Sequence, residues 1–383
     1  MQKVAFKYYN NNLLILESGI KMVKRKIFFL YLTRLILFIS LIAFLALYFN
    51  FNNFLFLSLS FVSLVLFLFA VKRNLELAYH EQFLSHKLQI NRNELNSLEH
   101  KYQDRDRGDE YNYLNPHLAT DFDIFGNGSL FQYLNRCSTR IGRDKFAETL
   151  CRSELNEDTI IRKQKAINEL SGKNEIVQDF QAYGKLISEN GSELSGLQSW
   201  LDEKDEKLKL LQISAYLFPL INFTWFALIG LGVFSLNSVL IPILLSLTVI
   251  GLNRKRIGKA HSKLSNTAKT FEKYYTLFKL IEGDNYKSSY LVDLKHQLTN
   301  RDKRASQSLK ALFKLLNSFD IRLNVFASFL LNSILLFDIH VYCRLAGWKR
   351  AHQNVISQWF STLSEFDALI SLATYAYNNQ EQV

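Results

Sequence analysis

Four long apolar runs, arranged as two pairs, constrain this chain more than any other feature of its sequence. The first run, residues 27–49, contains one charge, Arg34, and the second, residues 54–71, contains none. A helix over the first run would be about 34 Å long, which is enough to cross a hydrocarbon layer of about 30 Å. Only residues 50–53 separate the two runs. The pair therefore predicts a membrane hairpin of two antiparallel helices.

The second pair of runs lies in the middle of the chain, over residues 210–234 and 236–252. Pro219 and Pro242 lie inside these runs, and proline is tolerated better in membrane helices than in soluble ones. The pair predicts a second membrane hairpin, which interrupts a body of more polar sequence.

Arg34 needs a physical explanation, since a charge at the bilayer midplane costs about 2.5–3.5 kcal/mol on insertion scales. It lies about two helical turns inside the first run. Its long side chain can reach back toward the basic residues that precede the run. A structural role is therefore favoured over a functional one.

The net charge of +11 suggests a nucleic-acid-binding protein until the positive charges are located. Ten of them flank the apolar runs, and without these ten the net charge is +1. They are Lys21, Lys24, Arg25, Lys26, Lys72, Arg73, Arg254, Lys255, Arg256 and Lys259. The turns at residues 50–53 and 235–238 carry no lysine or arginine. The positive-inside rule therefore predicts that both turns lie outside and that both termini and the body lie in the cytoplasm.

Outside the apolar runs the sequence favours helices, since it has three prolines and no sustained alternation of polar and apolar residues. Leucines at helical spacing follow the second run and predict that its helix continues as a stalk, up to a polar linker at residues 101–115. These leucines are Leu77, Leu84, Leu88, Leu95 and Leu98. Ser129 and Gln132 have the spacing of a capping box, which predicts a helix start near Ser129. Further helices are predicted over residues 142–150, 157–170, 175–189, 257–281 and 369–377.

A further apolar segment, residues 323–339, is interrupted by Asn324, Asn332 and Asp338. A fifth membrane pass is one interpretation of this segment. Polar breaks of this kind suit the centre of a helical bundle better, so we expect the segment to lie in the core of the body.

Three stretches outside the runs carry a family resemblance. Residues 121–136 read DFDIFGNGSLFQYLNR, and residues 155–170 and 332–373 continue the likeness in order. Single residues that contribute to it are Thr139, Gly142, Arg143, Ile161, Arg162, Gln164, Ala166, Ile167, Asn332, Trp359, Ser371, Leu372 and Ala373. In their order and spacing, these stretches resemble the core, or lever, region of the MutS family of DNA mismatch-repair ATPases. The resemblance covers residues 113–200 and 305–377.

In the MutS family, two lever helices run out to a clamp that grips DNA and back again, and here the second membrane hairpin occupies that place. The mismatch-reading N-terminal domain, with its Phe-x-Glu motif, has no counterpart. The chain is therefore most similar to the membrane-bound MutS-related proteins of bacteria, which implies a location in the bacterial inner membrane.

The resemblance and the apolar runs together divide the chain into six segments. They are a cytoplasmic N-terminal segment (1–26), a transmembrane hairpin (27–73), a stalk and linker (74–112), the first half of a MutS-like core (113–209), a second transmembrane hairpin (210–253) and the second half of the core (254–383). The expected fold class is all-α, with two membrane hairpins and a cytoplasmic MutS-like helical bundle.

A MutS-like chain would continue past Ala373 into an ATPase whose GxxxxGK loop, followed by Ser or Thr, binds phosphate and magnesium. That loop occurs nowhere in the sequence. The chain is therefore expected to be no enzyme by itself, and ATP and Mg²⁺ are expected only of an ATPase domain outside it or of a separate ATPase subunit. The resemblance implies further partners, namely the lipid bilayer, a second copy of the chain and double-stranded DNA.

For DNA, the expected phosphate contacts come from a basic cluster, although such clusters are more often a solvated helix face. The cluster consists of Arg301, Lys303, Arg304 and Lys310. No catalytic, cofactor or metal residues are predicted, because the eight histidines are scattered and the three cysteines lack CxxC spacing. His340 and Cys343 are a single nearby pair, which cannot fill a tetrahedral zinc shell.

Two other functions stay open from the sequence. One is a membrane-anchored helical scaffold or interaction protein without DNA binding, which the missing clamp, mismatch reader and ATPase favour. The other is a small channel or transporter, a function suggested by the four apolar runs and by Arg34 within the first of them. Against the channel, the two hairpins lack paired intramembrane charges.

Overall fold

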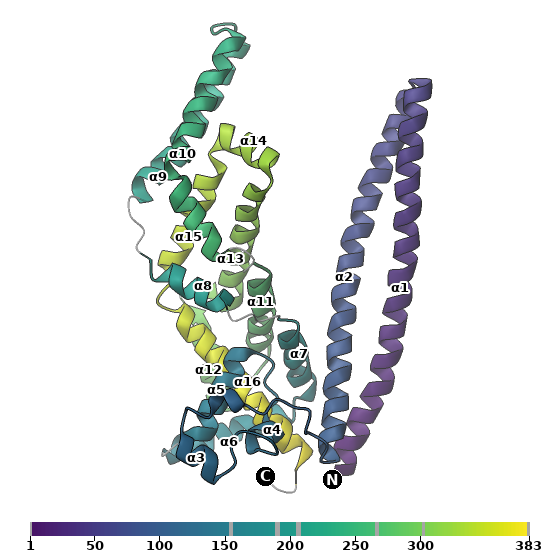
Figure 1. The fold of residues 1–383 in the computed structure, drawn as a ribbon, viewed down its shortest axis with the longest axis vertical. Coiled ribbons are helices and arrows are strands. Elements are labelled where there is room, and N and C mark those ends of the chain that lie inside the picture. Colours follow the sequence, from purple (N-terminus) through teal and green to yellow (C-terminus); the bar gives the residue numbers. More distant parts are fainter. Residues whose placement is uncertain are drawn as a thin grey trace.

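The computed structural model describes residues 2–152, 156–187, 192–203, 208–264, 268–300 and 303–380. Within these ranges the chain is almost entirely α-helical, as the sequence predicts (Figure 1). The one strand pairing among the described residues joins β1 (Thr299–Asn300) to β2 (Lys303–Arg304) in a two-residue antiparallel ladder. The fold class is therefore all-α.

Two very long helices, α1 (Gln2–Phe51) and α2 (Phe54–Leu98), lie side by side (Figure 1). Asn52 turns the chain between them with a φ of 50°. The Asn53 side chain accepts a hydrogen bond of 3.0 Å from a backbone amide in the first turn of α2. The predicted stalk is confirmed as a helix, because α2 runs unbroken from the second apolar run to Leu98. The N-terminal segment, which the sequence did not identify as helical, forms the first half of α1.

A group of short helices follows the stalk. They are η1 (Asp109–Tyr111), α3 (Pro116–Asp121), α4 (Leu130–Leu134), α5 (Arg140–Cys151), α6 (Glu157–Ser171) and α7 (Asn174–Lys185). The predicted helix start is confirmed, because Ser129 Oγ accepts a hydrogen bond of 3.1 Å from the Gln132 amide. The Gln132 side chain binds the Gly128 amide, one residue earlier than in a regular capping box. α7 ends at Lys185 instead of at the predicted residue 189.

The second pair of apolar runs also folds into neighbouring helices. The elements here are α8 (Ser192–Leu201), α9 (Leu208–Gly230), η2 (Leu236–Val239), α10 (Leu240–Leu264) and α11 (Ala268–Gly283). The chain turns at residues 231–235, where Gly232 has a φ of 77°, slightly before the predicted turn. The helix predicted over residues 257–281 corresponds to the end of α10 and to α11, and residues 265–267 of this prediction lie outside the described ranges.

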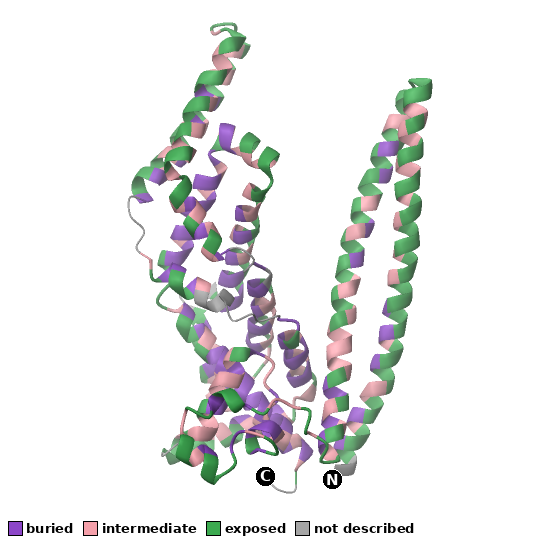
Figure 2. Ribbon diagram, viewed as in Figure 1, coloured by how far each residue is buried: buried purple, intermediate pink, exposed green. Residues whose placement is uncertain are grey.

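Within the described residues, α1, α2, α9 and η2–α10 are the segments long and apolar enough to cross a membrane as single spans. Much of the length of these helices is coloured as exposed in Figure 2. Many of their large apolar residues are among the exposed ones. Leu35 is 56% exposed, Phe69 66% and Leu220 65%. Since burial of such a side chain is worth about 1.5–3 kcal/mol, an apolar environment would stabilise these surfaces.

The remaining elements complete the helical body. They are α12 (Ser289–Gln297), α13 (Ala305–Asp320), η3 (Ile321–Leu323), α14 (Val325–Leu335), α15 (Phe337–His352) and α16 (Ile356–Asn378). The main core brings together side chains of α11, α13, α15 and α16, such as Phe278, Leu312 and Trp359. A smaller core around Phe131 and Phe146 joins α4 and α5 to α16.

The expectation that residues 323–339 lie in the core is wrong for their first half. Phe326 is 89% exposed and Val325 is 77% exposed, whereas Asn332 and Ile339 are buried. The helix also breaks, since α14 and α15 meet at an angle of 82°. Asn324 caps the start of α14, and Asn332 and Asp338 lie at the break between α14 and α15, so these residues do not mark the centre of one buried helix.

Candidate functional site

A polar cavity lies where the end of the stalk meets the helical body. Its volume is about 610 Å³, and we call it the junction cavity. The end of α2, the loop that follows it, the segment before α5 and the end of α7 line it. Six of its lining side chains are cationic, namely Lys101, Arg105, Arg136, Arg140, Arg143 and Lys185. Three are anionic, namely Glu94, Asp104 and Asp106.

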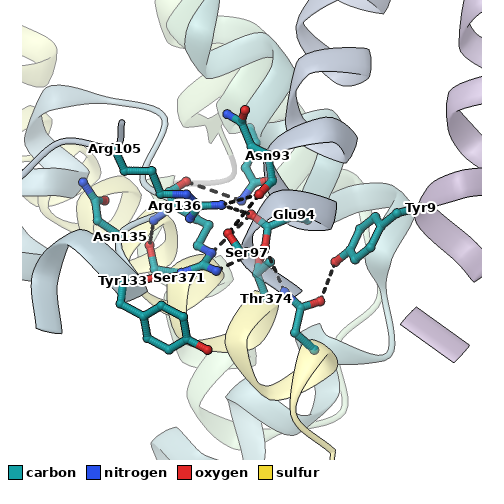
Figure 3. A network of polar contacts seen from close by, with 12 residues as sticks. Tyr9, Asn93, Glu94, Ser97, Arg105, Tyr133, Asn135, Arg136, Ser371 and Thr374 are labelled. Atoms are coloured by element: carbon teal, nitrogen blue, oxygen red, sulfur yellow. Dashed lines mark hydrogen bonds and ion pairs between the residues drawn. The ribbon is translucent and has the colours of Figure 1, made fainter. Parts of the chain in front are cut away.

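Glu94 of α2 is the centre of a buried network beside this cavity (Figure 3). Its Oε1 accepts hydrogen bonds from Arg105 Nη2 at 3.0 Å and Arg136 Nε at 3.2 Å. Its Oε2 accepts from Arg136 Nη2 at 3.2 Å and from Asn378 Nδ2 at 2.8 Å. Tyr9 Oη then donates to Asn378 Oδ1 at 2.9 Å. This Glu94 network joins α1, α2, the linker, the segment before α5 and α16 at one point.

The charges of the network determine the state of Glu94. Burial alone would raise the pKa of this carboxyl group, but the charges and hydrogen bonds of Arg136 and Arg105 lower the pKa to about 2. Glu94 is 2% exposed and Arg136 is 8% exposed. The network is therefore a buried carboxylate between two guanidinium groups, with one positive charge in excess.

The stalk is also held by polar side chains along the same face of α2. Asn91 and Gln178 of α7 exchange side-chain hydrogen bonds of 3.1 and 3.2 Å. Lys87 Nζ forms an ion pair of 2.5 Å with Asp179. Since paired polar groups of this kind require defined geometry, they fix the rotation of α2 about its axis against the body.

A second buried carboxylate, Asp367 of α16, caps the start of α5. It accepts hydrogen bonds from the Ser138 amide at 3.1 Å, from the Thr139 amide at 2.8 Å and from Thr139 Oγ1 at 2.7 Å. A Cβ atom at Gly142 would lie 2.2 Å from Asp367 Oδ2, so the close approach of the two helices requires glycine there. Burial raises the pKa of Asp367 to about 6 in spite of these donors. The contact joins the start of α5 to α16.

The lining of the junction cavity offers charged groups and hydrogen-bonding groups to a ligand. Cys137 and Ser138 are nucleophilic side chains on its wall. Burial raises the pKa of the Cys137 thiol well above its ordinary value, so the reactive thiolate is disfavoured. The excess of cations suits an anionic group, and the buried Gln181 Oε1, which has no hydrogen-bond partner, can accept a bond from a donor in the cavity.

The structure places the predicted DNA-binding residues elsewhere. Arg304 and Lys310 are exposed at the beginning of α13 and do not line the junction cavity. The Lys310 ammonium lies 5.7 Å from the centre of the Tyr275 ring. Lys303 belongs to β2, but its side chain lies outside the description, as does all of Arg301. Of the four residues in the cluster, Arg304 and Lys310 thus lie together on the exposed side of the beginning of α13.

No residue of the Glu94 network is predicted as functional from the sequence, although the sequence contains one signal for it. Asn91, Glu94 and Ser97 recur every three residues on the stalk helix, and all three are buried. A polar stripe at this spacing indicates a helix that packs through hydrogen bonds. Asn378 gave no comparable signal, because it meets Glu94 only through the tertiary fold.

Arg34 lies within the first pair of long helices. Its guanidinium carbon is 5.7 Å from the centre of the Tyr31 ring and 5.8 Å from that of Phe67 on α2. The Arg34 guanidinium group therefore makes cation–π contacts with two aromatic rings of the same helix pair. Among the described residues, no three His, Cys, Asp or Glu side chains are close enough to hold a metal ion.

The fold and the junction define this chain as an all-α protein with helices long and apolar enough to cross a membrane. Comparison with protein families, curated proteins and solved structures finds no match. The function must therefore be argued from the residues themselves.

Proposed function

We propose that the chain is a membrane-anchored, MutS-like helical module that transmits movement between its membrane hairpins and α16. The Glu94 network is the observation that carries this proposal. It binds the base of the α1–α2 pair directly to the last turn of α16, through Asn378. A rotation or tilt of the long pair therefore changes the position of α16, and the reverse also holds.

The resemblance to the MutS core covers two parts of the chain, residues 113–200 and 305–377. These parts pack together, since α16 packs on α5 and α6. Asp367 contributes the hydrogen bonds at this contact. By the same resemblance, the module works with a nucleotide-driven ATPase, which supplies the ATP and Mg²⁺ chemistry, and its ligand is duplex DNA.

The proposed setting is the inner membrane of a bacterium. The outward-facing apolar side chains of α1, α2, α9 and α10 would contact lipid. Basic residues flank these segments on the side of the body, and the connecting turns carry none, so the body and both termini lie in the cytoplasm.

The coupling can be tested by distances between spin labels in nanodiscs. Labels at Gln82→Cys on α2 and Gln358→Cys on α16 occupy exposed positions. We expect one narrow distance distribution, which Glu94→Gln broadens. Glu17→Gln, which removes a carboxylate from an exposed pair with Arg92, is the matched control and should leave the distribution narrow. If Glu94→Gln leaves the distribution as narrow as the control does, the network does not couple α2 to α16.

A second candidate function, a scaffold without DNA binding, is favoured by the pairing of the charges. Within the described residues, Arg105 and Arg136 at the junction cavity pair with Glu94, and Arg143 pairs with Asp106 at 3.0 Å. These groups are therefore less available to phosphates. Duplex DNA titration of the chain in nanodiscs at two salt concentrations separates the two functions.

DNA binding predicts an affinity that falls steeply with salt and falls further in Arg304→Glu with Lys310→Glu. Lys165→Glu, an exposed site on α6, is the control for net charge. An affinity that the double variant and the control lower equally would remove this cluster as the DNA site. No salt-dependent binding at all would leave the scaffold as the function.

A further inference from the structure

α14 presents an unusually large apolar surface for an element attached to the body. Phe326 is 89% exposed, Val325 77%, Leu330 60% and Phe329 57%, and Leu323 just before the helix is 69% exposed. Contiguous apolar surfaces of this kind mark contact with another apolar phase or protein. An occupant must therefore cover this face.

The C-terminal end of α14 is hydrogen-bonded to α9. Asn222 Nδ2 donates to the carbonyl oxygens of Ser333 at 3.3 Å and Ile334 at 2.7 Å, and it lies 3.0 Å from Ser246 Oγ on α10. Asn222 is the central residue of the apolar run at 210–234. The C-terminal end of α14 thus lies at half the depth of the α9–α10 pair and not at its base (Figure 1).

At this end of α14, carbonyl groups of the backbone are hydrogen-bonded to protein donors, as a lipid environment requires. The last carbonyl groups of a helix lack partners within the helix, and in hydrocarbon each unsatisfied group costs several kcal/mol. Here Asn222 supplies a donor for two of them. Asn332 Oδ1 accepts a hydrogen bond of 2.9 Å from the amide of Asp338, in the first turn of α15, and Leu336 turns the chain with a φ of 48°. The break is therefore sealed by protein.

The connections show that α14 and α15 do not form one complete span. α13, which precedes α14, packs against α11 of the body. α15 returns to α13, since Trp348 Nε1 donates to the Ser308 carbonyl oxygen at 2.9 Å. α16 follows and binds the Ser138–Thr139 segment through Asp367. A complete span would place α16 on the opposite side of the membrane from α5, which contradicts this contact.

We infer that α14 is a re-entrant helix that enters the half of the bilayer facing the body, where lipid covers Val325, Phe326, Phe329 and Leu330. This inference rests on the membrane anchoring under the proposed function. Lipid is the occupant because the face lies beside α9 and α10, whose own outward side chains, such as Phe223 and Leu244, are apolar and exposed. A second copy of the chain is the competing occupant.

A polar contact marks the base of the proposed element. The His261 ring lies 2.9 Å from Asp320, the last residue of α13. Arg322, which follows α13, reaches toward the break, where its Nε lies 3.8 Å from Asp338. His261 follows the basic group Arg254–Lys259, which flanks the fourth apolar run. Charges thus lie at the end of α13, where the chain would pass from the body into lipid.

The test uses spin labels on the full chain in lipid vesicles, with the native cysteines replaced by alanine. Labels at Phe326→Cys and Phe329→Cys report on α14. Phe223→Cys on α9 is the lipid reference, and Gln307→Cys, exposed on α13, is the aqueous reference. Collision with oxygen, which concentrates in lipid, and with a water-soluble nickel complex is measured at each site.

We expect both α14 sites to resemble Phe223→Cys, with an oxygen-to-nickel ratio several-fold above that of Gln307→Cys. If the α14 sites have the low oxygen-to-nickel ratio of Gln307→Cys while Phe223→Cys has a high one, the re-entrant helix is rejected and the membrane anchoring stands. Low access to both reagents at α14 would assign the face to a second copy and also overturn it. An aqueous ratio at Phe223→Cys would overturn the membrane anchoring itself.

A second measurement avoids the cysteine replacements. Phe326→Trp in the otherwise native chain adds a fluorophore that brominated lipids quench on contact. We expect quenching greater than that of the native tryptophans alone. Quenching equal to the native level, with Phe223→Trp quenched strongly, would again place α14 outside lipid.

Discussion

At the scale of single residues, the stability of the junction depends on the balance of charge around Glu94. Glu94→Gln leaves Arg105 and Arg136 buried without their carboxylate. Removal of one partner from a buried ion pair costs about 3–5 kcal/mol. We expect a loss of this size in the free energy of unfolding of the body, measured by denaturant titration in detergent. Glu17→Gln, at an exposed pair, should change it by less than about 1 kcal/mol.

The pKa of Glu94 predicts a definite dependence of stability on pH. Its folded-state pKa of about 2 lies below the unfolded value of 4.5, so its ionised form stabilises the fold. This contribution is complete above about pH 4.5 and is lost as the pH falls toward 2. Thermal unfolding followed between these pH values should show a steep decline for the native chain and a shallower one for Glu94→Gln. Equal slopes would mean that Glu94 does not titrate with the fold.

Gly142 tests the contact between the two halves of the body. Gly142→Ala introduces a Cβ atom 2.2 Å from Asp367 Oδ2, which forces the α5–α16 contact apart. Overpacking of this kind costs about 1–3 kcal/mol. Gly172→Ala is the matched control, because its Cβ would meet its nearest neighbour at an ordinary distance of 3.5 Å. The melting temperature should fall for the first variant only, and an equal effect of both would reject the steric argument.

At the scale of elements, Asn222 holds the broken end of α14 in place. Asn222→Leu leaves the carbonyl groups of Ser333 and Ile334 without this donor. An unsatisfied buried polar group costs about 1–3 kcal/mol. We expect a lower thermal stability in detergent and a broader range of spin-label distances between α9 and α14. Thr224→Val, whose hydroxyl bonds only within α9 at Leu220, should cause neither change.

The elements that the sequence predicted correctly are those with a local signal. Apolar runs located the four long segments, and the Ser129 cap located α4. Residues 2–26, the first half of α1, gave no such local signal. This part of α1 is stabilised by tertiary contacts, namely its packing against α2 and the hydrogen bond from Tyr9 to Asn378 of α16. The nature of α14 was missed because its polar residues cap a break, and sequence spacing cannot distinguish a capped break from a buried polar centre.

The candidate site was beyond sequence reasoning for a related reason. Glu94 and Asn378 are separated by 284 positions, and their contact exists only once α2 and α16 have been docked. Arg136 lies in a stretch that carried the family resemblance, but nothing in that stretch indicated its partner. The basic cluster at residues 301–310 was predicted to contact DNA from its local charge density alone. Its role in DNA binding stays a prediction.

At the scale of the whole molecule, the direction of insertion follows from the distribution of charge. Basic residues lie at the body end of each apolar pair, as Lys24, Arg73 and Arg254 do. The turns at 50–53 and 231–235 carry no lysine or arginine. Since positively charged flanks remain in the cytoplasm, we expect both turns outside and the whole body inside.

Labelling of single cysteines in intact cells checks this orientation. A membrane-impermeant maleimide should react with Asn52→Cys and Val233→Cys from outside, whereas Lys165→Cys on α6 should react only after lysis. The packing of α16 on α5 and the docking of α2 on α7 require one side for the entire body. Labelling of one turn from outside and the other from inside would therefore contradict the fold as well as the topology. Reaction of Lys165→Cys in intact cells, with both turns protected, would reverse the orientation and leave the fold intact.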